Sequence, residues 1–136
     1  MDASLRIEIF PADVDVTTSF YQRLGFQVAG QHDGPPRYAS LRLGAVWIGV
    51  CEADRVDPAR RAYPAMTEIV IDVDDVQATR DAIVEQGIEP TEDLRAREWG
   101  LTDFRVTDPD GYYLRFTGRR LLTGPNSVSR GAVSDT

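Results

Sequence analysis

The amino-acid sequence repeats at an offset of 62 residues, and this internal repeat limits the possible folds more than any other feature. Each copy opens with a segment in which isoleucine recurs at every second position, the pattern of a half-buried β-strand. These segments are residues 6–10 and 67–73. In each copy a segment with the apolar spacing of an amphipathic helix follows and ends at a glycine, Gly25 or Gly87. The chain is therefore predicted to contain two copies of one structural unit.

The first copy continues after its helix with three short predicted strands. Asp13 or Asp15 is predicted to cap the start of the helix, because a carboxylate can accept bonds from the first free backbone N–H groups. Turn residues at 33–36 (Asp-Gly-Pro-Pro) and at Gly44 separate the strands. The three predicted strands are residues 26–31, 37–43 and 45–53.

The second copy ends in a predicted β-hairpin. Its strands are residues 102–108 and 112–118, and the tight turn between them has the sequence Asp-Pro-Asp-Gly. Each copy is thus interpreted as strand, helix and three strands. The predicted fold class is α+β, with two tandem βαβββ modules.

A chain of 136 residues suits one domain, and residues 1–117 are assigned to it. Module one covers about residues 5–53 and module two about residues 66–117. The linker between them, about residues 54–65, is rich in Pro, Arg and Ala and has no clear period. Residues 118–136 are rich in Ser and Gly and are predicted to form a flexible C-terminal tail.

Alternation along each predicted strand assigns the side chains to two faces. If the aliphatic positions pack against the helices, the opposite face mixes charged groups with large aromatic rings. Such a mixture is typical of a ligand site, although filler or a dimer contact is the alternative. The side chains on this face include Arg6, Glu8, Phe10, Tyr38, Trp47, Cys51, Glu68, Asp72, Asp103, Arg105, Tyr113 and Arg115.

Residues 5–117 resemble the vicinal oxygen chelate superfamily, also called the glyoxalase/bleomycin-resistance/dioxygenase superfamily. The resemblance rests on the two modules, on TSFYQRLGF (residues 18–26) and on FRVTDPDGYYLRF (residues 104–116). It implies that the modules form a curved mixed sheet around a cavity and that the protein is a homodimer. Within the superfamily the chain is most similar to the metal-free bleomycin-resistance-like branch.

Enzymes of this superfamily typically hold one divalent ion with four side chains, often histidine and glutamate. The resemblance places these positions at Arg6, Gly49, Glu68 and Arg115. Of these only Glu68 can bind a metal, because arginine is a permanent cation and glycine has no side chain. One carboxylate is too few ligands for a divalent ion, and the only histidine, His32, is predicted to lie in a surface loop. We therefore expect no metal or other cofactor.

The substituted positions suggest what replaces the ion. We hypothesise that Arg6, Glu68 and Arg115 form an ion-pair cluster, because a buried glutamate needs such partners. The alternative is that they are separate surface charges. Trp99-Gly100 matches a Trp-Gly that borders the ligand groove in antibiotic-binding members, where an indole would stack on planar rings or cations. A place for Trp99 in the dimer interface is the alternative.

Bulk properties exclude several classes of partner. A net charge of −7 argues against nucleic acid as a partner. This charge suits a cationic small molecule; the alternative is that it only keeps the protein soluble. No apolar run approaches the roughly 20 residues that a membrane span needs, so no membrane partner is expected. The N-terminus has no secretory signal, so a cytoplasmic location is expected. Cys51 is the only cysteine, which excludes an intrachain disulfide.

The function predicted is metal-independent binding of a small molecule, aromatic or cationic, as in proteins that sequester antibiotics. The alternative is a lyase, isomerase or dioxygenase-like enzyme that acts on a small metabolite, with Glu68, Glu8, Asp72 or Asp103 as acid or base. A scaffold without a ligand is a third interpretation. No recognisable catalytic unit is present. The predicted ligand-binding residues are Arg6, Tyr38, Trp47, Cys51, Glu68, Trp99, Arg105, Tyr113 and Arg115.

Overall fold

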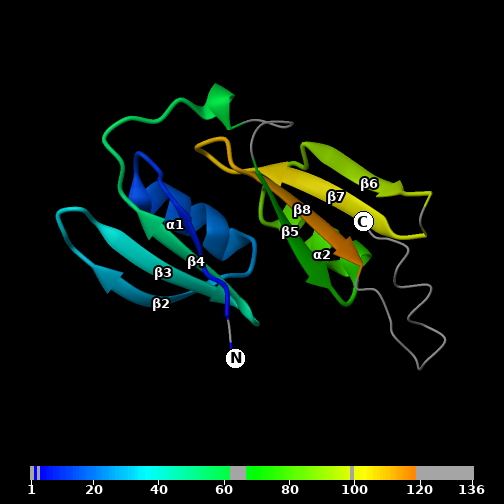
Figure 1. Cartoon of the computed structure of the whole chain (residues 1–136). Coiled ribbons are helices and arrows are strands. Elements are labelled where there is room, and N and C mark those ends of the chain that lie inside the picture. Colours follow the sequence, from blue (N-terminus) through cyan, green and yellow to red (C-terminus); the bar gives the residue numbers. More distant parts are fainter. Residues whose placement is uncertain (1, 3, 62–66, 99, 119–136) are drawn as a thin grey trace.

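The computed structural model describes residues 2, 4–61, 67–98 and 100–118 of the chain. The predicted tail beyond Gly118 and the position of Trp99 lie outside these residues. The elements, in chain order (Figure 1), are β1 (Ile7–Ile9), α1 (Val14–Arg23), β2 (Gln27–His32), β3 (Tyr38–Leu43), β4 (Val46–Cys51), the short 3₁₀ helix η1 (Pro58–Arg60), β5 (Glu68–Val73), α2 (Val76–Glu85), β6 (Glu92–Ala96), β7 (Thr102–Thr107) and β8 (Tyr113–Gly118).

The two helices confirm the internal repeat. Each has 10 residues, and the bounds of α2 are those of α1 moved by 62 positions. Asp13 and Asp75 occupy equivalent N-cap positions, where their carboxylates accept hydrogen bonds from backbone N–H groups of the first turn. Gly25 and Gly87 follow the helices with φ of 110° and 86°, which glycine adopts without steric cost.

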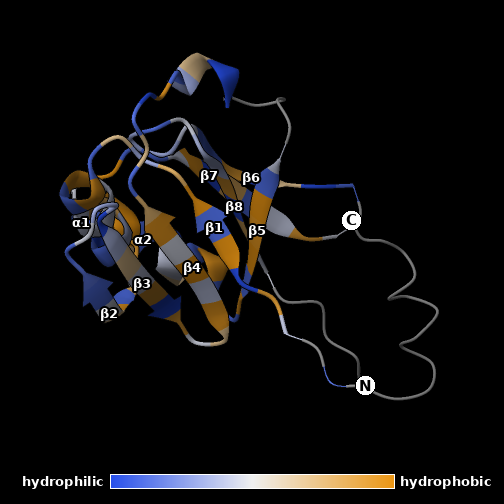
Figure 2. Ribbon diagram, turned by 60° about the vertical axis from the view of Figure 1, so that its left-hand side comes forward, coloured by the Kyte–Doolittle hydropathy of each residue, from blue (hydrophilic) through white to orange (hydrophobic). Residues whose placement is uncertain are grey.

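The strands form two four-stranded mixed sheets, and the predicted α+β class with two tandem βαβββ modules is confirmed. The orders are β1-β4-β3-β2 and β5-β8-β7-β6. In each sheet the first strand of the module lies parallel to the last, and the other neighbours are antiparallel. The edge strands β1 and β5 lie next to each other where the modules meet, and both helices lie on one side of the molecule (Figure 2).

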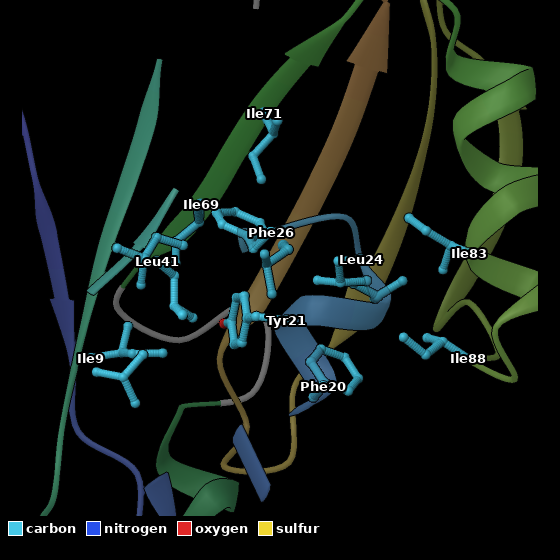
Figure 3. Packing of buried hydrophobic residues seen from close by; sticks show 14 of the residues in the cluster. Ile9, Phe20, Tyr21, Leu24, Phe26, Leu41, Ile69, Ile71, Ile83 and Ile88 are labelled. Atoms are coloured by element: carbon cyan, nitrogen blue, oxygen red, sulfur yellow. The ribbon is translucent and has the colours of Figure 1, made fainter. Parts of the chain in front are cut away.

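One hydrophobic core joins the modules. The aliphatic face of each strand is buried as predicted, and Figure 3 shows side chains from α1, α2 and both sheets packed together. Phe104 and Phe116 stack at 5.1 Å between ring centroids inside the second module. The buried side chains of both modules belong to one cluster, so the two modules share a core.

The turn of the last hairpin is bound to the first helix. The hydroxyl of Tyr21 donates to Asp108 at 2.8 Å, and the hydroxyl of Thr17 donates to Asp110 at 2.8 Å. Both carboxylates are buried, with 4% and 7% of their surface exposed. Burial raises the pKa of the Asp108 carboxyl, and burial beside Asp108 raises the pKa of the Tyr21 phenol well above its usual value. The two sequence motifs that define the resemblance are therefore in direct contact.

Two local expectations differ from the structure. His32 is the last residue of β2 and not a loop residue, because the ladder continues to its partner Tyr38; its ring nitrogen Nδ1 accepts from the Gly34 N–H at 3.1 Å. The position of strand β6 was not predicted, since Leu94 is the only aliphatic residue larger than alanine among its five positions. In the described part of the chain, no helix is long and apolar enough to cross a membrane.

Candidate functional site

The faces of the two sheets that lie opposite the helices carry the predicted site residues. Aliphatic neighbours of these residues are buried on the other face, so the predicted alternation holds on β3, β4, β5, β7 and β8. Within one chain the predicted residues fall into two groups. Arg6, Tyr38, Trp47 and Cys51 belong to the first sheet, and Glu68, Arg105, Tyr113 and Arg115 belong to the second.

The second sheet carries a network of six charged side chains, hereafter the ion-pair network. Strands β5, β6 and β7 supply its carboxylates, and β7, β8 and the residue just after β6 supply its guanidinium groups. Each of its side chains forms an ion pair with at least one member of opposite charge. The members are Glu68, Glu92, Arg97, Asp103, Arg105 and Arg115.

Arg105 is at the centre of the ion-pair network. Its Nε donates to Glu68 Oε2 at 2.7 Å, and its Nη1 donates to Glu92. The side chain is only 12% exposed, and its guanidinium lies 5.8 Å from the ring centroid of Tyr113. Although burial opposes its charge, the two carboxylates raise the pKa of Arg105, and it stays a cation at any working pH.

Asp103 is the most deeply buried member of the ion-pair network. Its side chain is 0% exposed, and its Oδ1 accepts from Arg97 Nε at 2.9 Å. Arg115 Nη1 lies 3.4 Å from the other oxygen, Oδ2. Burial opposes ionisation of Glu92, but Arg97 and Arg105 together hold its pKa below the usual value. The Glu92 carboxylate is therefore charged at neutral pH.

The hypothesis of an Arg6–Glu68–Arg115 cluster is correct in part. Glu68 lies 3.3 Å from Arg115 Nε, as predicted, but in the described chain Arg6 pairs with Glu8, at 2.8 Å. The reason is that β1 belongs to the other sheet, where Glu8 stands on the same face two residues away. Arg105 takes the predicted place of Arg6. It is the direct cross-strand partner of Arg115, and Glu68 between them offsets the repulsion of two like charges.

The first sheet presents a hydrogen-bonded pair over Gly49. The Tyr38 hydroxyl donates to Glu8 Oε2 at 2.8 Å, and the same oxygen accepts from Arg6 Nε at 2.8 Å. A methyl group at Gly49 would overlap both Glu8 and Tyr38, so only glycine leaves room for the pair. Burial, followed by the bond to Glu8, raises the pKa of the Tyr38 phenol.

A cavity of about 990 Å³ lies at the junction of the two sheets; neither Glu8 nor Tyr38 is among its described lining residues. Arg6 and Trp47 line it from the first sheet, and Val70 of β5 lines it from the second. The Trp47 ring is 38% exposed, and the Arg42 guanidinium lies 5.6 Å from its centroid. The indole of Trp47 and the guanidinium groups of Arg6 and Arg42 thus border the cavity. Such a surface suits a planar ring, or a polar group attached to a planar ring.

The remaining predicted residues lie apart from this cavity. Cys51 ends β4 opposite Tyr38 and is half-buried. Tyr113 is buried beneath the ion-pair network at 7% exposure. Of the proposed acids and bases, Glu68 and Asp103 are held by arginines, and Asp72 is exposed on β5. A carboxylate that is bound to guanidinium groups is a poor general base, because its charge is already neutralised.

The four positions that the resemblance assigns to a metal do not fit one. Glu68 is bound by two arginines, and the space beside Gly49 is filled by Glu8 and Tyr38. Two of the four positions are arginines, which cannot donate a lone pair to a cation. Among the described residues, no group of three or more His, Cys, Asp and Glu side chains is placed to hold a metal ion.

Sequence reasoning missed Glu92 and Arg97. Both belong to the segment 92–97, which has charged side chains at four of six positions and one large apolar residue, Leu94. Such a pattern is typical of a charged edge strand. The segment could have been recognised as the missing strand of module two, but its register could not, since the ladder shifts between Glu92 and Arg95.

Comparisons with known proteins agree with the geometry. A family model described as Glyoxalase/Bleomycin resistance protein/Dioxygenase superfamily matches residues 4–116. No protein with a curated description matches the chain.

Many solved structures share the fold. A bleomycin resistance determinant encoded on the transposon Tn5 is 23% identical, with a TM-score of 0.74 over 88% of this chain and 100% of that one. A bleomycin-binding protein complexed with bleomycin is 24% identical, with a TM-score of 0.69 over 88% and 99% of the two chains. A glyoxalase family protein from Enterococcus faecalis is 27% identical, with a TM-score of 0.67 over 84% and 94%.

Proposed function

The chain belongs to the glyoxalase/bleomycin resistance/dioxygenase superfamily, and on that premise we propose that it binds a small molecule without a metal ion. The proposal rests on the side chains at the four positions that hold the metal in enzymes of the superfamily. Glu68, the one carboxylate among them, is bound by Arg105 and Arg115. Removing either arginine would leave a poorly compensated buried charge. A metal ion would therefore have to break these ion pairs to gain a single ligand.

The proposed ligand has a planar aromatic part. Trp47 presents an exposed ring at the cavity of about 990 Å³, a volume within the range of drug-sized sites. A bleomycin-binding protein and a bleomycin resistance determinant share this fold, which favours an antibiotic as ligand of this chain as well. The net charge of −7 attracts a cationic ligand at long range, whereas Arg6 and Arg42 at the cavity require that its cationic group lie away from them.

We also propose that two copies form a homodimer through the junction of the sheets. The free edges of β1 and β5 offer unpaired backbone groups there. Exposed apolar side chains lie around them, with Leu5 at 77% and Val70 at 45%. A second copy placed on this surface would cover the cavity and bring the first sheet of one copy near the second sheet of the other. Sedimentation of wild type and of Val70→Asp tests this, and a wild-type monomer at micromolar concentration contradicts it.

Tryptophan fluorescence tests the ligand site directly. The chain has two tryptophans, Trp47 and Trp99, so the variants Trp47→Phe and Trp99→Phe each leave one reporter. An aromatic cationic antibiotic bound at the cavity quenches the Trp99→Phe protein and leaves the Trp47→Phe protein less affected. Quenching in Trp47→Phe alone would move the ligand to Trp99. Fluorescence that no aromatic cation changes in either variant contradicts the proposed site.

A further inference from the structure

A second cavity lies between the modules on their helical side, away from the ion-pair network. Its volume is about 830 Å³. The end of α1, the turn after β3, the strand β5 and one face of α2 line it, and we name it the inter-module groove. Its floor is apolar: Leu24, Ile71 and Ile83 lie on facing elements there, as Figure 3 shows.

The rim of the inter-module groove is acidic. Among the described residues that line it, Asp72, Asp74 and Glu85 are carboxylates and Arg23 is the one cation, which leaves a formal charge of −2. The C-terminal ends of both helices also line it, at residues 22–25 and 85–86. Each such end is the negative pole of a helix dipole, although the turn that follows each helix donates hydrogen bonds to most of its last carbonyl groups. The internal repeat is the reason that both ends reach the same groove, because it places the two helices in equivalent positions.

We propose that the inter-module groove is a second binding site, for an organic cation that carries an apolar body. The acidic rim and the helix ends complement a protonated amine, and the aliphatic floor buries hydrocarbon. A metal ion is not the occupant, since no group of His, Cys, Asp and Glu in the described residues is placed to hold one. The volume suits a molecule of drug size. The two cavities adjoin at Val46 and Val70, which line both, but Trp47 lines only the other cavity and Glu85 only the groove. The acidic rim therefore does not depend on the function proposed above.

Three probes with a similar phenylbutyl body differ in the charge of their end group: 4-phenylbutylammonium, 4-phenylbutanol and 4-phenylbutanoate. They separate the contribution of charge to binding from that of apolar contact. Each is titrated into the ¹⁵N-labelled full chain, and amide shifts are followed. The amides of Gly25 and Gln86, which line the groove and not the other cavity, are the reporters, and Gly111 is the remote control. The cation is expected to move the first two and leave Gly111 unchanged, with affinity in the order ammonium, alcohol, carboxylate.

A variant pair tests the acidic rim. Asp72→Asn with Glu85→Gln removes two rim charges and is expected to weaken 4-phenylbutylammonium about fivefold, as for two exposed charge contacts. The matched control, Asp33→Asn with Glu89→Gln, removes the same charge from exposed positions outside the lining and leaves the affinity unchanged.

Three results would overturn the inference. Equal affinity for the three probes would mean that charge is irrelevant. Movement of the Trp47 indole signal in place of Gly25 would put the cation at the other cavity. Movement of Gly25 and Gln86 on dilution of the protein alone would mean that a second copy occupies the groove.

Discussion

Replacing Asp103 by asparagine should destabilise the protein far more than the change in size suggests. The amide side chain would keep the shape and one acceptor oxygen, but the buried carboxylate charge would be gone. In the wild type that charge faces Arg97 at 2.8 Å and Arg115 at 3.4 Å, with none of its side-chain surface exposed. Loss of one partner from a buried ion pair costs about 3–5 kcal/mol. Because the amide retains one hydrogen bond, we expect a loss near the lower end, about 3 kcal/mol.

Urea unfolding followed by circular dichroism measures this loss. A decrease of that size also lowers the melting temperature by about 10 °C in a domain of this length. The matched control is Asp93→Asn. Asp93 also pairs with an arginine, Arg80, at 2.8 Å, but 56% of its side chain is exposed. Exposed pairs contribute about 0–1 kcal/mol. Equal small losses for the two variants would refute the view that the ion-pair network is buried and cooperative.

Three further perturbations follow from the same contacts. Tyr21→Phe removes the hydroxyl that donates to buried Asp108, and a loss of about 1–3 kcal/mol in urea unfolding is expected; a loss under about 0.5 kcal/mol contradicts the inter-module bond. Burial raises the pKa of Asp108 in the folded state, so the folded protein binds more protons than the unfolded chain between pH 3.8 and that raised pKa. The contribution of Asp108 to the free energy of unfolding is therefore full below pH 3.8 and is lost as pH rises through the folded pKa. Asp108→Asn should remove this dependence of stability on pH, and an unchanged stability profile in the variant contradicts the prediction. Gly49→Ala places a methyl group against Glu8 and Tyr38, and about 1–3 kcal/mol of overpacking is expected; a crystal structure with the Glu8–Tyr38 bond intact and no loss of stability would oppose this account.

The helices could be predicted closely because their signals are local. The N-cap aspartates and the glycines after the helices recur at one offset, so each copy supports the assignment of the other. The two faces of the strands were also predictable, since aliphatic and polar residues alternate with period two. Arg6 could not be placed from sequence, because its partner depends on which strands pair. Alternation fixes the face of a side chain, not its distance from a residue in another sheet.

The contact between Tyr21 and Asp108 shows a second limit of the sequence. Both residues belong to recognisable motifs, but they are separated by 87 positions and nothing local links them. Their bond depends on how the modules pack, which the repeat itself does not specify. For the same reason Glu92 and Arg97 were missed: their role depends on the register of an irregular edge strand.

Thermal unfolding of the full chain with and without a divalent ion tests whether the protein binds its ligand without a metal. The protein is melted in EDTA and in Mn²⁺, each alone and with a panel of aromatic cationic antibiotics. The account predicts no change with Mn²⁺ alone, and a rise with a bound antibiotic that is the same in both buffers. At a hundredfold excess over Kd that rise corresponds to about 2.7 kcal/mol. Stabilisation by Mn²⁺ alone, or by an antibiotic only when Mn²⁺ is present, would contradict metal-independent binding.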